Sequence, residues 1–388
     1  MHRLILSGCL ISVVSWLLAF PAHGTEWQVG PQRALKLPSA AARLAKDGDV
    51  VSIDAGLYQG DVASWPQQRL TIRGMAGGAH LDAIGNAAEG KAIWVLKGNN
   101  TVVENIELSG ASAPALNGAG IRFEGTHLTL RNCHFHHNQM GILTGVNPDS
   151  DILIENSEFN DNTVDYPRHG KLGHNIYIGN IRRFTLQNSY IHDASTGHNV
   201  KSRARENYIL YNRITDERNG SSYLVDLPDG GGYLIGNLFH QSANTENAAM
   251  LAFAAEHNQT QPNQQLYLVN NTFVNDYPGG SFLHNHSIAT AMLINNLLIG
   301  EATAMIGPNQ ENHDLKAKAN VLLDPASYDY RLKPNAPAID QGISPGLAAN
   351  GMLLNPQFVY RHPRGSEKRR QQGPLDVGAY EFIAKQPD

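Results

Sequence analysis

One short pattern recurs along most of the chain: an asparagine flanked on both sides by alternating apolar residues. The fragments that carry it are VVENIEL, TLRNCHF, LIENSEF, TLQNSYI, ILYNRIT, LIGNLFH, LVNNTFV and LINNLLI, and KANVL continues the series. Their asparagines are Asn105, Asn132, Asn156, Asn188, Asn212, Asn237, Asn271, Asn296 and Asn320. The differences between successive positions are 27, 24, 32, 24, 25, 34, 25 and 24. A base period of about 24 residues, with longer steps that hold insertions, predicts a solenoid.

The local period indicates which solenoid this is. Each unit contains short stretches of alternating apolar and polar residues, rich in β-branched side chains, which favour strands over helices. A second apolar group lies midway between asparagines, as in GIRF, GILT, NIYIG, NVKS and YLVD. Three short strands and three turns account for about 24 residues, with strands stacked at ~4.8 Å. We therefore predict an all-β fold, a single-stranded right-handed parallel β-helix.

The asparagines have a structural role in such a coil. Asparagine tolerates the left-handed backbone conformation of a tight turn, and its amide can hydrogen-bond to the asparagines of the coils above and below. Eight repeats of the same role argue against ligand binding.

The ends of the coil need covering, because an open coil exposes unpaired strand edges. We expect an amphipathic helix over residues 33–47 to close the N-terminal mouth, and irregular segments to form the C-terminal cap. The predicted organisation is a signal peptide at 1–24, an N-terminal cap at 25–47, the β-helix at 48–325 and a C-terminal cover at 326–388. The basic run at residues 368–370 is expected in a solvated loop.

The first residues predict export. A short basic start precedes an apolar run over residues 4–20, and small residues at Ala22 and Gly24 favour cleavage before Thr25. The run is short for a membrane span, so we expect a periplasmic or extracellular protein. Removing this segment leaves one cysteine, Cys133, which alternates with apolar residues and is expected to be buried and inert. With 17% charged residues and a net charge of −5, the chain lacks a nucleic-acid-binding footprint, and we expect a monomer.

The sequence resembles secreted pectin-lyase-like β-helix proteins. The resemblance rests on the opening KDGDVVSIDAGLY, the Asn-centred coils and the closing SYDYRLKPNAPAIDQG…DVGAYEF. It implies the fold and a polysaccharide-directed activity. The family includes polysaccharide lyases, glycoside hydrolases, uronate epimerases and members with no known activity.

A basic segment follows an insertion in the fourth step. Seven cations lie between residues 166 and 205: Arg168, Lys171, Arg182, Arg183, Lys201, Arg203 and Arg205. Only Asp193 opposes them within the segment, so the local net charge is +6 (7 − 1). Such a concentration of positive charge would attract an anionic ligand, and an acidic polysaccharide is the expected partner.

A repeated triplet in this segment sets the register of two coils. Gly173-His174-Asn175 recurs one coil later as Gly197-His198-Asn199. The two histidines should stack, with Tyr177 beneath Lys201. Alternation then points Ile176, Ile178 and Val200 inward, and Tyr177, Lys201 and Arg203 outward. An outward Lys201 should contribute little to stability. The alternative is that the histidines only end strands.

This set of side chains suits β-elimination from a uronic acid. Arg203 or Arg205 could neutralise the uronate carboxylate, which makes the C5 proton easier to remove. Lys201 could take the proton if neighbouring cations depress its pKa, and His198 is the alternative base. Tyr177 or His174 could protonate the leaving oxygen. The remaining predicted substrate contacts are Arg168, His169 and Lys171.

KSRARENYILYNRIT also resembles the chondroitinase-B and alginate lyase branch, in which a Lys-Ser pair supplies the base; the resemblance implies Lys201 and Ser202. The branch expects an arginine on the next coil, where Leu227 and Pro228 stand, and acidic calcium ligands at residues 194–196, which are Ala-Ser-Thr. We therefore predict no metal or other cofactor at this site.

Other readings remain open. A hydrolase would need two nearby carboxylates, for which Asp226 and Asp229 are available, although Asp226 could point inward. GHNIYIG faintly resembles the Gly-His-Gly segment of polygalacturonases. A C5-epimerase or a non-catalytic glycan-binding or envelope protein could use the same face. The weaker candidates are Glu256 and His257 at the groove edge, His284 and His286 as a metal pair without a third ligand, and His134, His136 and His137 on the outside of a coil.

Overall fold

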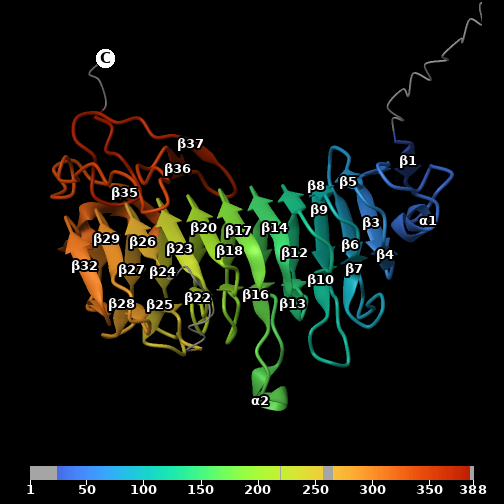
Figure 1. Cartoon of the computed structure of the whole chain (residues 1–388), viewed down its shortest axis with the longest axis horizontal. Helices are drawn as coiled ribbons and strands as arrows, with labels where there is room; N and C mark the ends of the chain where they lie inside the picture. The colour runs from blue at the N-terminus through green and yellow to red at the C-terminus, as the bar shows by residue number, and fades with distance from the viewer. Residues whose placement is uncertain (1–23, 219, 257–264, 385–388) are drawn as a thin grey trace, which may run out of the picture.

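The computed structural model describes residues 24–218, 220–256 and 265–384. In this part of the chain, short strands wind into an elongated coil whose axis is horizontal in Figure 1. Three long sheets run along the coil, and the strands within them pair in parallel. The parallel β-helix predicted from the repeat is confirmed.

The three sheets are named A, B and C. Sheet A contains, in spatial order, β1 (Glu26–Val29), β2 (Val50–Ile53), β5 (Thr71–Gly74), β8 (Thr101–Glu104), β11 (Leu128–Arg131), β14 (Asn147–Glu155), β17 (Ile181–Gln187), β20 (Glu206–Leu210), β23 (Gly231–Ile235), β26 (Leu266–Val269), β29 (Ala291–Ile294) and β32 (Asn309–Asn312). Sheet B contains β3 (Gly56–Gln59), β6 (Ala79–Asp82), β9 (Ile106–Ser109), β12 (His134–His136), β15 (Glu158–Asn160), β18 (Tyr190–His192), β21 (Arg213–Thr215), β24 (Leu238–Gln241), β27 (Thr272–Asn275), β30 (Leu297–Ile299) and β33 (Leu315–Ala317). Sheet C contains β4 (Ala63–Trp65), β7 (Ala92–Leu96), β10 (Ala119–Phe123), β13 (Met140–Thr144), β16 (His174–Ile178), β19 (Val200–Ser202), β22 (Val225–Leu227), β25 (Ala249–Phe253), β28 (Ser281–Asn285) and β31 (Thr303–Ile306).

The other elements are short. They are the helices α1 (Pro38–Ala42) and α2 (Tyr166–His169), the 3-10 turns η1 (Ala319–Val321) and η2 (Pro325–Ser327), and the antiparallel pairs β34 (Leu322–Asp324) with β35 (Asp329–Leu332) and β36 (Phe358–Tyr360) with β37 (Ser366–Lys368).

The core is a set of stacks of inward side chains along the coil axis. Phe135 stacks on Phe159 with ring centroids 4.5 Å apart, and Phe239 stacks on Phe273 at 4.8 Å. All four rings are buried, and burial of such a side chain contributes about 1.5–3 kcal/mol. Because identical positions repeat in each coil, one alternating pattern specifies the whole core.

The turn between sheets A and B contains two adjacent positions that can hold asparagine. The sequence repeat treats them as one position. Asn105, Asn132, Asn156 and Asn188 occupy the first position, with φ between 50° and 56°. Asn212, Asn237, Asn271 and Asn296 occupy the second position, where each buried side-chain amide donates to the next coil: Asn212 to Asn237 Oδ1 at 3.1 Å and Asn237 to Asn271 Oδ1 at 3.0 Å. Both predicted roles of asparagine are therefore present, but in different residues. The first four asparagines of the series adopt the left-handed turn, and the next four form the amide ladder.

The ladder position in the other coils is filled by other residues. Cys133, Ser157 and Ser189 precede Asn212, and Asp314 follows Asn296, whose amide it accepts at 2.7 Å. The prediction that Asn320 continues the series is wrong, because Asn320 lies in η1 after the last ladder residue.

A second amide ladder lies near the start of sheet C. Buried Asn138, Asn162, Asn175 and Asn199 hydrogen-bond in sequence at 2.8–2.9 Å, and Asn199 donates to Asp216 at 3.2 Å. The asparagines of the two GHN triplets are therefore part of this ladder. The ladder fixes the backbone position of the histidine that precedes each of them.

The start of the coil differs from the prediction. The helix expected over residues 33–47 is confined to α1, because Leu37 precedes a proline and is extended, with φ −131° and ψ 143°. Strand β1 already pairs with β2 in sheet A, so the sheet begins before residue 48. The apolar segment predicted as a signal peptide lies at residues 1–24, outside the described residues except Gly24. Within the described ranges, the helices are all too short or too polar to cross a membrane.

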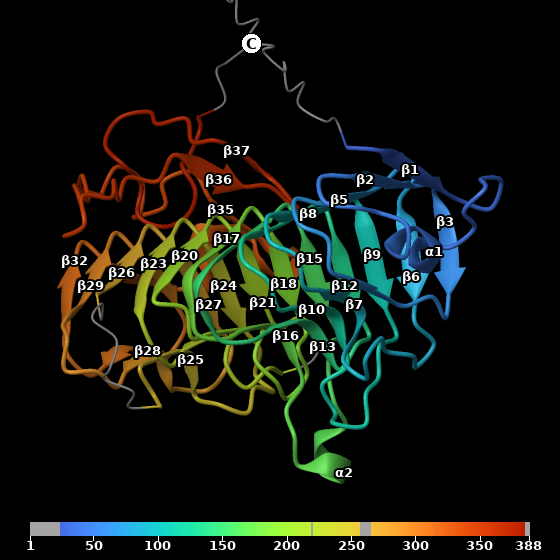
Figure 2. The ribbon, with the colours of Figure 1, turned by 45° about the vertical axis from the view of Figure 1, so that its right-hand side comes forward.

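The C-terminal segment packs along the outside of sheets A and B. Tyr330, Val377 and Ala379 bury the outer face of sheet B, and Leu354 packs on the outer face of sheet A. Figures 1 and 2 place this cover on the side of the coil away from strands β16, β25 and β28 of sheet C. Among the described residues, the cover therefore lies over sheets A and B and not over sheet C at this end of the molecule.

Two single-residue predictions have opposite outcomes. Of the basic run at residues 368–370, Lys368 and Arg370 are exposed as expected, but Arg369 is buried: it pairs with Glu381 at 2.7 Å and donates to backbone oxygens such as that of Ala379. Cys133 is fully buried as expected, and burial raises the pKa of its thiol to about 12, so it is inert.

Candidate functional site

The predicted register of the candidate site is confirmed. Strands β16, β19 and β22 are neighbours in sheet C, and Tyr177, Lys201 and Asp226 align across them. Ile176, Ile178 and Val200 point inward and are fully buried. Tyr177, Lys201 and Arg203 alternate with them and lie on the outer face.

The two histidines lie one above the other in neighbouring coils, as predicted, with their rings tilted by 39°. The rings of His174 and His198 have centroids 4.9 Å apart, and His174 Nδ1 accepts a hydrogen bond from the His198 backbone N–H at 3.0 Å. Both residues are buried. Tyr223, which the sequence did not single out, packs against the His198 ring at 5.3 Å. The first histidine thus fixes the backbone of the second.

Lys201 lies between two carboxylates. Its Nζ donates to Asp226 Oδ2 at 2.7 Å and to Glu256 Oε1 at 3.0 Å. Asp226 Oδ2 is also 3.4 Å from His198 Nε2. Asp226 therefore does not point into the core, as the sequence allowed, but shares the outer face with Lys201, and its own burial comes from this cluster.

Glu256 completes the cluster from the end of β25. Its carboxylate accepts two hydrogen bonds from Arg203, at 2.9 Å from Nε and 2.5 Å from Nη2. The same guanidinium donates to the Tyr177 hydroxyl and lies over the Tyr177 ring, 5.1 Å from its centroid. A carboxylate is thus held by a bidentate arginine and a lysine.

These contacts decide the protonation states. Burial lowers the pKa of Lys201, but Asp226 and Glu256 outweigh it, and the net pKa is raised. The neighbouring cations therefore do not depress the Lys201 pKa, and that condition for a neutral lysine base is wrong. Burial, with the nearby cations, lowers the pKa of His174 to about 3. Burial, His174 and Lys201 together hold the pKa of His198 well below 6.5, so both imidazoles of the site are neutral at pH 7.

The positive charge of the basic segment is largely cancelled by other coils. Arg182 pairs with Asp151, Arg183 with Glu206 at 2.7 Å, Lys201 with Asp226 and Arg203 with Glu256. These carboxylates lie outside residues 166–205, so a count within the segment omits them. The predicted excess of +6 does not describe the folded surface.

The remaining predicted substrate contacts lie apart from this cluster. Arg168 and His169 are exposed on α2, at the tip of a hairpin that projects from the coil in Figures 1 and 2. Lys171 donates to the Ala115 backbone oxygen. Arg205 is exposed in the turn before β20. Within the described ranges, none of these side chains pairs with a residue of the His198–Lys201 cluster.

The site residues do not suit a calcium ion. Ala194, Ser195 and Thr196 stand where the resemblance expects acidic ligands, and the carboxylates of Asp226 and Glu256 are already engaged by Lys201 and Arg203. Ser202 faces the core and is fully buried, so it does not join the outer face.

The other sequence candidates are placed as follows. Asp229 is buried in the turn after β22, and its Oδ1 accepts from the Gly230 N–H. His284 and His286 stack at 3.6 Å, but no third ligand joins them among the described residues. His134 and His136 lie on the outer face of sheet B, and His137 follows them at the exposed turn, as expected. His257 lies outside the described residues.

Asp226 and Glu256 differ in how well the sequence could place them. The same step of one coil that sets Tyr177 beneath Lys201 sets Asp226 above it, since 201 and 226 differ by 25. Strict use of the alternation would have turned Asp226 outward. Glu256, which the sequence placed at the groove edge, lies in the turn three residues after the end of β25. Strand alternation no longer fixes the direction of a side chain there, so the sequence does not predict the contact of Glu256 with Arg203.

Several solved structures resemble this chain in fold. The pectate lyase Pel9A superimposes with a TM-score of 0.64 at 14% identity, covering 93% of this chain and 97% of that one. The PL6 family alginate lyase AlyGC gives a TM-score of 0.45 at 13% identity, covering 73% and 40%. The pectin methylesterase from carrot gives 0.39 at 12% identity, covering 77% and 85%. By sequence, neither a family model nor a curated protein matches the chain. The stacked parallel sheets and the match to Pel9A show that the chain has the fold of a right-handed parallel β-helix.

Proposed function

We propose that the chain is an exported polysaccharide lyase that cleaves an acidic, uronate-containing glycan by β-elimination. One observation carries this proposal: Arg203 and Lys201 both donate hydrogen bonds to the Glu256 carboxylate. A uronate carboxylate of the substrate could accept the same hydrogen bonds. The pectate lyase that shares the fold acts on such a polymer. The site lies on sheet C, on the side of the coil away from the C-terminal cover.

In the proposed complex, a uronate carboxylate replaces Glu256. Arg203 binds it with two parallel N–H groups, and the Lys201 ammonium adds a second positive charge. Removal of the C5 proton moves negative charge onto this carboxylate, so both cations stabilise the transition state more than the ground state.

The proton transfers use the neutral groups beside the cations. His198 Nε2 accepts the C5 proton, the C–H electron pair forms the C4=C5 double bond, and the C4–O bond breaks. The Tyr177 hydroxyl, which accepts a hydrogen bond from Arg203, donates its proton to the leaving oxygen. His174 positions His198 through the backbone hydrogen bond at 3.0 Å, and Asp226 keeps Lys201 in place.

The test is a panel of alginate, pectate, glucuronan and glycosaminoglycans, monitored by the ultraviolet absorbance of unsaturated products. New absorbance that is lost in Arg203→Ala supports the lyase. The matched control is Arg183→Ala, an arginine that pairs with Glu206 on sheet A and should leave turnover unchanged.

The alternatives give different outcomes on the same panel. New reducing ends without absorbance would identify a hydrolase, for which Asp226 and Glu256 are the available carboxylates. Exchange of the C5 proton with solvent deuterium, without cleavage, would identify an epimerase. Binding with no chemical change would leave a glycan-binding protein.

A further inference from the structure

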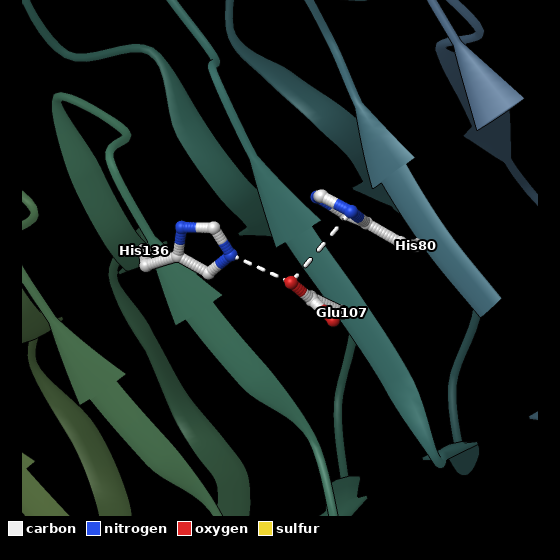
Figure 3. A group of neighbouring side chains, drawn as sticks. All are labelled: His80, Glu107 and His136. Carbon is white, nitrogen blue, oxygen red and sulfur yellow. Dashed lines mark hydrogen bonds and ion pairs between the residues drawn. The ribbon is translucent and has the colours of Figure 1, made fainter. Parts of the chain in front are cut away.

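The outer face of sheet B carries a group of side chains that the proposed reaction does not use. His80, Glu107 and His136 project from the neighbouring strands β6, β9 and β12, as Figure 3 shows. One ligand atom from each lies within 4.8 Å of the other two. Within the described ranges, this is the one group of three such side chains with that spacing.

The distances fit a tetrahedral ion. Glu107 Oε1 is 2.8 Å from His136 Nε2 and 3.6 Å from His80 Nδ1. Bonds of 2.0–2.1 Å to a tetrahedral ion place ligand atoms about 3.3 Å apart, and the two distances lie on either side of that value. The third pair, His80 and His136, lies within 4.8 Å, so the two imidazoles would have to rotate toward the ion.

Both imidazoles are oriented by partners on their other nitrogen. His80 Nε2 hydrogen-bonds to Ser109 Oγ at 2.7 Å, and His136 Nδ1 to His137 Nδ1 at 2.8 Å. Such contacts fix the tautomer and ring orientation of metal-binding histidines. The strands themselves are rigid supports, because each pairs on both sides within sheet B.

The site is accessible. The three side chains are partly exposed, at 29%, 39% and 16% for His80, Glu107 and His136. Glu107 also lines a hollow of about 620 Å³ beside the C-terminal residues Pro363 and Arg364. An ion can therefore enter from solvent, and its fourth position would be open to water.

We propose that His80, Glu107 and His136 bind one divalent transition-metal ion of the zinc class. Two imidazoles and one carboxylate suit zinc and its neighbours, whereas calcium and magnesium prefer oxygen ligands. The ion would link three successive coils on sheet B, whereas the candidate reaction site lies on sheet C, so its first effect is on stability.

The test uses tag-free protein dialysed against a chelator and titrated with ZnCl₂ by calorimetry, with CaCl₂ as the comparison ion. We expect one tight equivalent of zinc, none of calcium, and a rise in melting temperature with zinc. Cobalt(II) should give the visible absorption of a tetrahedral site.

The variants separate this site from the other histidines of the chain. His136→Ala and Glu107→Gln should each weaken the tight equivalent at least about tenfold and remove the zinc-dependent rise in melting temperature. His134→Ala is the matched control: it lies on the same strand but hydrogen-bonds to Asn160, and it should keep the site. Tight zinc binding that survives both His136→Ala and Glu107→Gln, or its absence from the wild-type protein, would overturn the proposal.

Discussion

At the scale of single residues, Lys201 is the charged centre of the candidate site. Its side chain is only 13% exposed and pairs with Asp226, which is 5% exposed. The sequence predicts that an outward lysine contributes little to stability. The pairing changes this expectation, because removing the lysine would leave a buried carboxylate without its counter-ion.

We predict that Lys201→Ala destabilises the fold at neutral pH. Breaking a buried ion pair costs about 3–5 kcal/mol of the free energy of unfolding. Because Lys201 is partly exposed, we expect a loss of about 3 kcal/mol or less. Burial already raises the pKa of Asp226, and loss of Lys201 would raise it further. The free energy of unfolding should therefore fall as pH rises above the unfolded pKa of aspartate. Urea unfolding at acidic and neutral pH measures this, with Lys201→Met/Asp226→Asn as the charge-matched control that should recover stability.

The pH dependence of turnover distinguishes the two candidate bases. Because the pKa of His198 is held well below 6.5, kcat/KM should stay flat through neutral pH and fall in acid. Lys201→Arg keeps the charge and should retain activity within about tenfold, whereas His198→Ala should lose about 10²–10⁴. A rate that climbs towards high pH, together with an inactive Lys201→Arg, would instead assign the proton transfer to Lys201, whose pKa is raised.

At the scale of elements, the turn between sheets A and B uses asparagine for two separate purposes. The first position needs a left-handed backbone, as at Asn132 with φ 52°. The second needs a buried amide that donates to one coil and accepts from another, as at Asn237.

We predict opposite responses at these two positions. Asn132→Gly should change the free energy of unfolding by less than about 1 kcal/mol, because glycine adopts this conformation readily. Asn237→Ala should cost about 2–4 kcal/mol, because it leaves several buried groups unpaired, among them the Asn212 N–H and amide. Denaturant unfolding of both variants tests this, and equal effects would contradict the division into two positions.

Each amide ladder ends on an aspartate, and this makes stability depend on pH. Burial raises the pKa of Asp216 to about 7 and that of Asp314 to about 6. An acid whose pKa is higher in the folded state stabilises the fold fully only below its unfolded pKa, and this contribution is lost as pH rises towards the folded value.

We predict that Asp216→Asn is more stable than the wild type at pH 8 and similar to it near pH 4. The amide would continue the ladder from Asn199 without a charge, and the gain at high pH should be on the order of 1–3 kcal/mol. The exposed Asp149→Asn is the control and should show no such difference. Urea unfolding at the two pH values gives the comparison, and a variant that loses stability equally at both would rule out titration of Asp216.

At the scale of the whole molecule, the C-terminal cover and the α2 hairpin define how a polymer could approach. The cover buries the outer faces of sheets A and B in the C-terminal coils, and the hairpin with α2 projects from sheet C at β16 (Figure 1). Because the net charge is −5, attraction of a polyanion must come from local groups.

We predict that affinity for a polyuronate falls as salt is added, since exposed charges are screened beyond ~10 Å at 0.1 M, and that neutral glycans bind poorly. Arg203→Ala should weaken binding of both short and long uronate chains. The double variant Arg168→Ala/Lys171→Ala should weaken binding of long uronate chains only. Only sugars far from Arg203 along the chain would reach the hairpin tip. Binding isotherms with a trisaccharide and with polymer, at two salt concentrations, provide the measurement.

The sequence by itself determined the coil and the local register of the site. The asparagine repeat, strand alternation and the two GHN triplets suffice because each coil stacks on the next at a fixed step, so sequence offset becomes spatial position. The alignment of Tyr177 with Lys201 and the stacking of the two histidines follow from this step alone.

Tertiary structure decided what the register cannot encode. Glu256 reaches Arg203 from the turn that follows β25, and Asp151 reaches Arg182 from a coil outside the basic segment. The burial of Arg369 against Glu381 depends on where the C-terminal cover lies. In each case a charged side chain pairs with a residue of another coil or of the cover. Electrostatic pairing depends on distance in space, and a count of charges along one segment of the sequence does not give that distance.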